Sequence, residues 1–329
     1  MNEVPKKETI PERYQSVDYQ KEVSEENARE SIGAVSPQIH IKTIERVGGG
    51  IGSVAFMVND EYIFRFPRHE RADESLGVEM RLLPVLEKHM TLPIPHFEIM
   101  GKQAGSDLRF VGYKAIRGVQ MERETLFDRT EHGQVLGPNR HLTEQIATFF
   151  REIHSFNVQT ARDLGVPERS LKARMMGQIL DAREYIFPLI QQKFPEQANR
   201  IIESTEIAFD DYLSDSGNFD YEPRLIHGDL EAEHIFVDPE KRTVTGFIDF
   251  GSMRIDDPDY DLWRPYSWFG REFMDLLLEQ YPHKDPERLY KKMEFFWTAQ
   301  EGQRAVRAIM INDENSANQT IRRIKERLF

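Results

Sequence analysis

Two acidic residues at the ends of a short predicted hairpin constrain this chain more than any other feature. Asp229 belongs to a His-Gly-Asp-Leu segment that precedes an apolar run at 235–237. A polar turn follows, and a second apolar run at 244–248 ends directly at Asp249, within an Asp-Phe-Gly triplet. Because two apolar runs joined by a tight turn predict an antiparallel hairpin, we expect Asp229 and Asp249 on one side of it.

This order of residues is typical of phosphoryl transfer. In kinases a catalytic Asp is followed by a metal ligand five residues later and then by an Asp-Phe-Gly triplet that holds Mg²⁺. The reaction needs one group that orients the nucleophile and a metal ion that neutralises phosphate charge. Each motif alone is weak evidence, and a surface hairpin with scattered acids is the competing interpretation. The ordered combination, with strand, turn and strand between the acids, favours the functional interpretation.

Composition narrows the classes of protein that remain. The chain has 329 residues, enough for about two domains, and a net charge of −13 that argues against nucleic acid as a main partner. It contains no cysteine, which excludes disulfides, thiolate chemistry and Cys-ligated zinc. No apolar segment typical of a signal peptide or a membrane span is present, so we expect a cytoplasmic protein without a membrane partner. A monomer is the working expectation for its oligomeric state.

The first part of the chain predicts a polar segment followed by a small antiparallel sheet. Residues 1–34 are rich in Glu and Lys, which indicates a mobile arm or a peripheral helix near 24–31. The dipeptide Asn59-Asp60 is typical of a two-residue hairpin turn, and 75–89 is expected to form one helix. Short apolar segments predict five strands, at 39–44, 54–58, 62–66, 97–100 and 108–116.

From residue 118 onward, apolar residues recur at helical spacing. The helices are expected at 141–156, 171–192, 199–213, 259–281, 287–300 and 303–328. A β-rich small lobe followed by an α-rich large lobe predicts an α+β, two-lobe fold. We divide the chain into a polar arm (1–34), a nucleotide-binding lobe (35–117) with a hinge near 113–118, and a helical lobe (118–329) that carries the catalytic hairpin, metal site and acceptor site.

A glycine-rich turn lies between two of the predicted strands and contains Gly48, Gly50, Gly52 and Ser53. Glycines in such a turn let backbone N–H groups approach phosphate oxygens closely. No helical pattern follows, unlike a Rossmann fingerprint, and no Gly-Lys-Ser/Thr is present, unlike a Walker A loop. Three glycines can also simply form a hairpin. Their position upstream of the two acids favours a loop that covers nucleotide phosphates.

A nucleotide site of this kind also needs a cation on the third strand and an acid in the following helix. Arg65 and Glu79 occupy these positions, and the competing interpretation is that Glu79 is an exposed acid paired with Arg81. Arginine can hold phosphate through two hydrogen bonds but lacks the compact ammonium of lysine. The connection at 113–118 is expected to offer backbone groups to the nucleobase, from Tyr113, Ala115 and Ile116.

Together these motifs resemble the aminoglycoside phosphotransferase family, whose fold is protein-kinase-like. The shared motifs are His-Gly-Asp-Leu at 227–230, Ile-Asp-x-Gly at 248–251 and Asp-Pro-x-x-Asp-Leu at 257–262, and the resemblance extends from about 39 to 281. It implies that Asp229 is the catalytic base, that Asp249 binds Mg²⁺ and that Asp261 braces the catalytic loop. His227 is then a structural support rather than a proton shuttle.

One departure from the family pattern points to a subgroup. The usual metal-binding Asn is His234 here, although imidazole is a poor ligand for Mg²⁺. The 2″-type aminoglycoside phosphotransferases also have His at this position, and their sequences are similar to this one at 58–64 and 110–114. This resemblance implies Mg²⁺ as cofactor with ATP or GTP as co-substrate.

The sequence defines the binding site for the phosphate acceptor less clearly than the nucleotide site. Residues 229–261 contain ten acidic and three basic residues, which fits metal binding with solubility or a basin for a cationic substrate. The 2″-type enzymes carry drug-binding acids just after the last motif, whereas the segment 263–268 has none. Its aromatic residues form either core packing or an apolar wall for a less charged acceptor. The candidate acceptor-binding residues are Glu231, Glu233, Trp268 and Trp297.

The leading functional hypothesis is transfer of the γ-phosphate of ATP or GTP to a hydroxyl of an antibiotic, most simply a cationic aminoglycoside. A macrolide or metabolite kinase of the same fold is the first alternative, since Arg65 in place of lysine is associated with macrolide phosphotransferases. A non-catalytic nucleotide-binding protein is the second, supported by the unusual Arg65 and His234. A protein kinase is disfavoured because no Ala-Pro-Glu segment follows Asp249.

Overall fold

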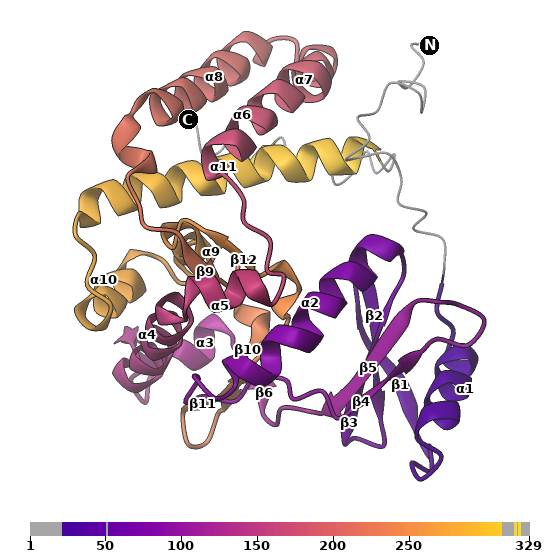
Figure 1. Ribbon diagram of the computed structural model, residues 1–329. Coiled ribbons are helices and arrows are strands. Elements are labelled where there is room, and N and C mark those ends of the chain that lie inside the picture. Colours follow the sequence, from indigo (N-terminus) through magenta and orange to yellow (C-terminus); the bar gives the residue numbers. More distant parts are fainter. Residues whose placement is uncertain (1–21, 51, 311–318, 321, 324–329) are drawn as a thin grey trace.

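The computed structural model describes residues 22–50, 52–310, 319–320 and 322–323. These residues form a β-rich N-terminal part and a larger helical C-terminal part, joined by the segment after strand β5 (Figure 1). Most of the predicted arm at 1–34, up to residue 21, lies outside the described residues. Most of the predicted final helix, 303–328, also lies outside the described residues.

The N-terminal part is built on a five-stranded antiparallel sheet with the order β1-β2-β3-β5-β4. Asn59 and Asp60 have φ angles of 56° and 54°, the paired positive values that a tight two-residue hairpin requires, so the predicted turn is confirmed. The strands are β1 (Ile44–Gly49), β2 (Ser53–Val58), β3 (Tyr62–Pro67), β4 (Ile99–Lys102) and β5 (Arg109–Lys114).

The strand predicted at 39–44 is wrong, since β1 begins only at Ile44. The side chain of Asn59 explains the difference. Its Oδ1 accepts from the backbone N–H groups of Lys42 and Thr43, at 2.8 and 3.2 Å, and its Nδ2 donates to the carbonyl of His40. These bonds replace the ladder partners that a strand would need.

Two helices flank the sheet on opposite sides (Figure 1). Helix α1 (Glu25–Val35), close to the peripheral helix predicted near 24–31, buries Ala28 and Ile32 in the sheet's own core. We therefore propose that the small lobe begins at α1 rather than at residue 35. Helix α2 (Glu70–Leu86) starts five residues earlier than predicted, because His69 caps it by accepting from the Ala72 N–H at 3.1 Å.

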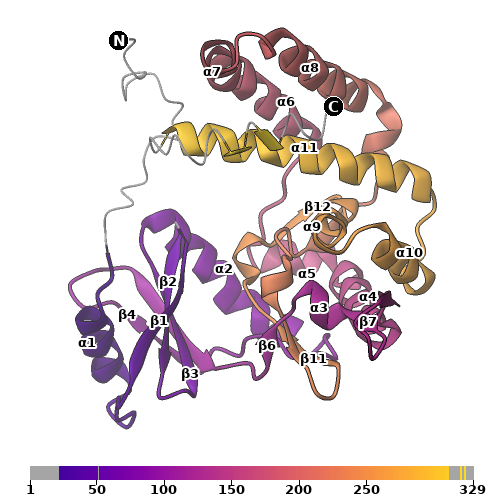
Figure 2. The same cartoon turned by 180° about the vertical axis from the view of Figure 1, so that it is seen from behind.

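The C-terminal part consists mainly of helices, and the long α11 lies between the α6–α8 group and α9 (Figure 2). The predicted helix at 171–192 is interrupted by a π-helical turn at Ala182–Ile186, and the one at 259–281 is broken at Gly270, where φ is 84°. The predicted break between 300 and 303 is absent. The helices are α3 (Arg123–Leu126), α4 (Arg140–Ser155), α5 (Val158–Asp163), α6 (Leu171–Asp181), α7 (Phe187–Lys193), α8 (Ala198–Ser214), α9 (Asp259–Phe269), α10 (Arg271–Gln280) and α11 (Pro286–Met310).

The predicted catalytic hairpin is present, as strands β10 (Ile235–Asp238) and β11 (Thr243–Phe247). Phe247 of β11 stacks on Phe149 of α4 with ring centroids 3.9 Å apart, which fixes the hairpin against the main hydrophobic core. Short strands that the periodicity did not predict complete this region. They are β6 (Val119–Gln120), β7 (Phe127–Arg129), β8 (Val135–Pro138), β9 (Arg224–Ile226) and β12 (Arg254–Asp256).

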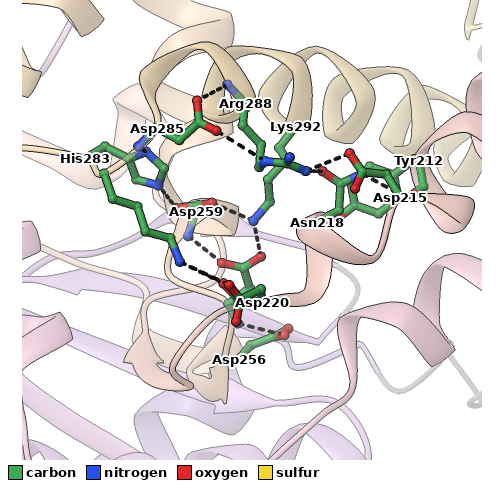
Figure 3. A network of polar contacts seen from close by, with 12 residues as sticks. Tyr212, Asp215, Asn218, Asp220, Asp256, Asp259, His283, Asp285, Arg288 and Lys292 are labelled. Atoms are coloured by element: carbon green, nitrogen blue, oxygen red, sulfur yellow. Dashed lines mark hydrogen bonds and ion pairs between the residues drawn. The ribbon is translucent and has the colours of Figure 1, made fainter.

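A buried ionic cluster ties α11 to the start of α9, next to the last sequence motif (Figure 3). Lys292 is 3% exposed, and its Nζ lies 2.5 Å from Oδ2 of both Asp257 and Asp259. His283 Nε2 lies 3.1 Å from the other oxygen of Asp259. Burial, and then the charge of Asp259, raises the pKa of Asp257 to about 6 despite the opposing effect of Lys292.

We predict that Lys292→Met destabilises the protein by about 3–5 kcal/mol at pH 8, because it leaves two buried carboxylates without their cation. The pKa of Asp257 in the folded variant then lies even further above that of the unfolded chain. The destabilisation is therefore relieved as the pH falls through that raised value. Urea denaturation at pH 8 and pH 5 should show a smaller difference from wild type at pH 5.

Lys241→Met is the matched control, because Lys241 is 77% exposed and pairs with Asp238 at the surface. It should change the free energy of unfolding by less than about 0.5 kcal/mol. A Lys292→Met protein as stable as wild type at pH 8 would contradict the structural role of the cluster.

Candidate active site

The buried carboxylate of Asp261, at the start of α9, holds in place the loop that carries Asp229, here called the catalytic loop. Its oxygens accept hydrogen bonds from the backbone N–H groups of His227 and Gly228, at 2.8 and 2.6 Å. His154 of α4 contacts the same carboxylate through Nε2 at 3.0 Å. Although burial opposes ionisation, His154, His227 and the Gly228 N–H hold the pKa of Asp261 below its usual value. The geometry is that of a brace, as the family resemblance implied for Asp261.

His227 connects the catalytic loop to the metal-binding loop. Its side chain is fully buried, and Nε2 donates to the carbonyl oxygen of Ile248 at 3.1 Å. Burial lowers the pKa of His227, which favours the neutral ring. Its Nδ1 lies 3.4 Å from the Asp229 N–H, which donates to it, so both ring nitrogens contact the backbone and the geometry supports the predicted structural role.

Gly228 is required by the fold of this loop. Its φ is 82°, and a Cβ there would meet the backbone oxygen of Ser252 at 2.5 Å. Any side chain would therefore push the catalytic loop away from the segment that follows Asp249.

Asp249 and His234 face each other beside the catalytic loop. His234 Nδ1 lies 2.7 Å from the carbonyl oxygen of Asp229, which can only accept, so the proton is on Nδ1. In the neutral ring with this tautomer, Nε2 presents its lone pair toward Asp249, whose Oδ2 lies 3.6 Å away. A lone pair facing a carboxylate leaves a position suited to a cation.

These two residues fit a metal ion shared with a nucleotide. Mg²⁺ is commonly bound by one or two protein ligands together with substrate phosphates and water. Within the described part of the chain, no group of three or more His, Asp or Glu side chains is arranged to hold a metal by itself. Asp249 and His234 could therefore supply only part of a coordination sphere, with the other ligands coming from nucleotide phosphates and water.

A chain of charged groups connects β3 to the metal-binding loop. Arg65 Nη1 lies 2.7 Å from Glu79 Oε2, Nη2 lies 3.2 Å from Oε1, and Nη2 is 3.8 Å from Asp249 Oδ1. The predicted pairing of Arg65 with Glu79 is thus confirmed. Burial disfavours the charged guanidinium, but Glu79 and Asp249 outweigh it and raise the pKa of Arg65. Arg65 in turn lowers the pKa of Asp249 against partial desolvation, so this carboxylate, which is 49% exposed, remains ionised.

The glycine-rich turn connects β1 and β2, with Gly50 N–H donating to the carbonyl of Ser53 at 3.1 Å. None of Gly48, Gly50 and Gly52 has a left-handed backbone. A Cβ at Gly50 would meet nothing within 4 Å, and one at Gly48 or Gly52 would make only ordinary contacts. The packing of the described residues therefore does not require these glycines.

A cavity of about 350 Å³ adjoins the connection between the two parts of the protein. Ala115 and Ile116 line it, as expected for residues next to a nucleobase, but the buried Tyr113 does not. The N–H of Ala115 already donates to the carbonyl of Glu61, at 2.8 Å. The other lining residues are Pro93, Ile94, His96, Glu98, Lys114, Arg117 and Thr245.

The predicted acceptor residues differ in their exposure and their contacts. Glu231 is paired with Arg264, and Glu233 is 60% exposed near His234. Trp268 is half exposed near the end of α9, whereas Trp297 on α11 packs edge-on against Tyr266.

Sequence reasoning missed two important residues, His154 and Arg264. Arg264 follows the last motif, and its Nη2 lies 2.5 Å from Oδ1 of Asp229. The helical spacing of 141–156 placed His154 on a helix but did not indicate that it contacts Asp261. For Arg264 the only available signal was a charged residue within an aromatic segment.

The fold and this constellation define a kinase-like small-molecule phosphotransferase. The sequence profile of the Phosphotransferase enzyme family (APH) matches residues 43–296, and the chain belongs to this family. The "Uncharacterized protein YcbJ" of Bacillus subtilis (strain 168) is 23% identical over 239 residues, 71% of each chain.

Within the described residues, no helix is long and apolar enough to cross a membrane.

Solved structures of antibiotic-modifying enzymes share the fold. The GDP and kanamycin complex of APH(2″)-IIIa is 27% identical with a TM-score of 0.81, covering 91% of this chain and 97% of the other. The gentamicin–APH(2″)-IIa complex is 22% identical with a TM-score of 0.71, covering 93% and 96%. Macrolide 2′-phosphotransferase type I is 17% identical with a TM-score of 0.65, covering 92% and 98%.

We predict that Gly50→Val weakens Mg–GTP binding about fivefold or more, which corresponds to roughly 1 kcal/mol. The side chain has space in the unliganded protein but blocks phosphate from the backbone N–H groups. Isothermal titration calorimetry measures the affinity, and thermal denaturation should show unchanged stability. Gly33→Val, at an exposed position of α1 that is also open, is the control. Equal nucleotide affinity in Gly50→Val and wild type would remove the turn from the nucleotide site.

Proposed function

We propose that the protein transfers the γ-phosphate of ATP or GTP to a hydroxyl of a small-molecule acceptor. The observation that carries this proposal is the placement of Asp229 and Asp249 at adjoining loops, joined through His227 and His234. His227 spans from the Asp229 loop to Ile248, and His234 spans from the Asp229 carbonyl to the Asp249 carboxylate. A base and a metal ligand are thereby kept in one fixed relation, as phosphoryl transfer requires.

Each charged residue then has a role in the reaction. The nucleobase occupies the cavity beside Ala115 and Ile116, and the glycine-rich turn covers the phosphates. Arg65 neutralises phosphate charge while Glu79 fixes its orientation. Asp249 and His234 hold Mg²⁺, which when bound offsets the charge on the phosphates. Asp229 accepts the proton of the attacking hydroxyl, and that oxygen bonds to the γ-phosphorus as the bond to the diphosphate breaks.

An antibiotic is the acceptor class that the similar structures suggest. Kanamycin in the APH(2″)-IIIa complex makes an aminoglycoside the first acceptor to test. A macrolide or a metabolite is the second candidate, and one observation favours it. Arg264 places a positive charge directly against Asp229, where a cationic acceptor would have to bring its hydroxyl.

We predict that Asp229→Asn lowers the transfer rate at least about a hundredfold, because the amide cannot accept the hydroxyl proton. Mg–nucleotide affinity should change little, since Asp229 acts on the acceptor. Nucleotide turnover across a panel of aminoglycosides, macrolides and small amino alcohols measures the first quantity, and calorimetry the second. Asp107→Asn, at a carboxylate that is 98% exposed, is the matched control.

Two results would contradict the proposal. Turnover of Asp229→Asn at the wild-type rate would show that Asp229 is not the base. A wild-type protein that binds Mg–nucleotide but transfers phosphate to no acceptor in the panel and hydrolyses no nucleotide would favour the non-catalytic alternative.

A further inference from the structure

Arg264 occupies the acceptor side of the catalytic carboxylate. Its guanidinium bridges two acids of the catalytic loop, with Nη2 2.5 Å from Asp229 Oδ1 and Nη1 hydrogen-bonded to Glu231 Oε1. The side chain is only 14% exposed, so this contact is shielded from solvent. It thus links the segment that follows the last sequence motif to Asp229.

The surroundings of Arg264 hold the guanidinium in this position. Its Cζ lies 4.5 Å from the centre of the Trp263 ring, on which it packs. Its Nε is buried and has no hydrogen-bond partner within the described ranges of the chain. Burial lowers the pKa of Arg264 to about 10 against the opposing effect of Asp229, so the group stays charged at neutral pH.

A second arginine reinforces the same arrangement. Arg304 of α11 lies 3.7 Å from Glu231 Oε1 and 2.7 Å from Glu301 Oε1. Glu231 is therefore neutralised twice by the protein itself. An acceptor that carries ammonium groups finds no unpaired carboxylate in Asp229 or Glu231, and it meets a like charge within the same space.

We propose that Arg264 selects acceptors by charge, its guanidinium taking the place that an acceptor's ammonium group would otherwise fill beside Asp229 and Glu231. The site then suits hydroxyl compounds that bring no ammonium group to these carboxylates. This inference rests on the proposed function and narrows its substrate class. Arg264 acts here as a specificity-determining residue, because it excludes one class of acceptor without taking part in proton transfer.

The test measures the binding of kanamycin, a compound with several ammonium groups, to the protein saturated with Mg–GDP. Removing the guanidinium in Arg264→Ala frees Asp229 and leaves Glu231 paired with Arg304 alone, so kanamycin should bind at least about tenfold more tightly than to wild type. The gain should fall as salt rises, because it is electrostatic. Kanamycin acetylated on its amines keeps its hydroxyl groups but has no ammonium charge, and it should show no gain.

Further variants separate this effect from changes in folding. Arg264→Gln keeps most of the length and can still donate a hydrogen bond, so it should show the same direction of change if Arg264→Ala does not fold. Adding Glu231→Gln to Arg264→Ala should remove most of the gain. Arg140→Ala breaks an exposed pair with Glu279 far along α4 from the site and should leave kanamycin affinity unchanged.

Kanamycin binding to the Arg264 variants that is equal to or weaker than binding to wild type would overturn the inference. This outcome is distinguishable from failure of the proposed function, because binding and transfer are measured separately. A wild type that transfers phosphate, with variants that gain no kanamycin affinity, contradicts the selection by charge alone. A wild type that transfers nothing contradicts the proposed function, whatever the variants bind.

Discussion

The carboxylate of Asp261 is the constraint on which the rest of the site depends. It accepts two consecutive backbone N–H groups from the catalytic loop and contacts His154 behind them. These three contacts fix the peptide planes that precede Asp229, so the direction of its side chain is set by the core of the helical part. Lys292 of α11 pairs with Asp259, two residues before Asp261, and thereby connects α11 to the segment that contains Asp261.

A second chain of contacts brings the N-terminal part to this fixed loop. Glu79 orients Arg65, Arg65 reaches Asp249, and the hydroxyl of Ser75 donates to the carbonyl of Gly251 at 2.6 Å. Both Glu79 and Ser75 lie on α2, so movement of this helix would shift Arg65 and the loop that carries Asp249 together.

Local patterns in the sequence predicted the catalytic hairpin, the Asn59-Asp60 turn and the pairing of Arg65 with Glu79, because each depends on neighbouring residues or on ordered motifs. The short strands β6 to β9 were not predicted, since two to four residues carry no measurable periodicity. Arg264 could not be placed either. It is separated from Asp229 by 35 residues, and only the folding of α9 against the catalytic loop brings the two together. Its contact with Asp229 is the observation on which the proposed selection against cationic acceptors rests.

The central claim is that Asp249, aided by His234, holds the metal of a nucleotide beside Asp229. Isothermal titration calorimetry of GTP with wild type and Asp249→Ala, each with and without Mg²⁺, tests it most directly. Asp249 supplies the only carboxylate that faces His234 Nε2 within 3.6 Å among the described residues. The account predicts that Mg²⁺ strengthens GTP binding to wild type at least about tenfold and adds little in the variant. Equal Mg²⁺-dependent affinity in the two proteins would contradict it.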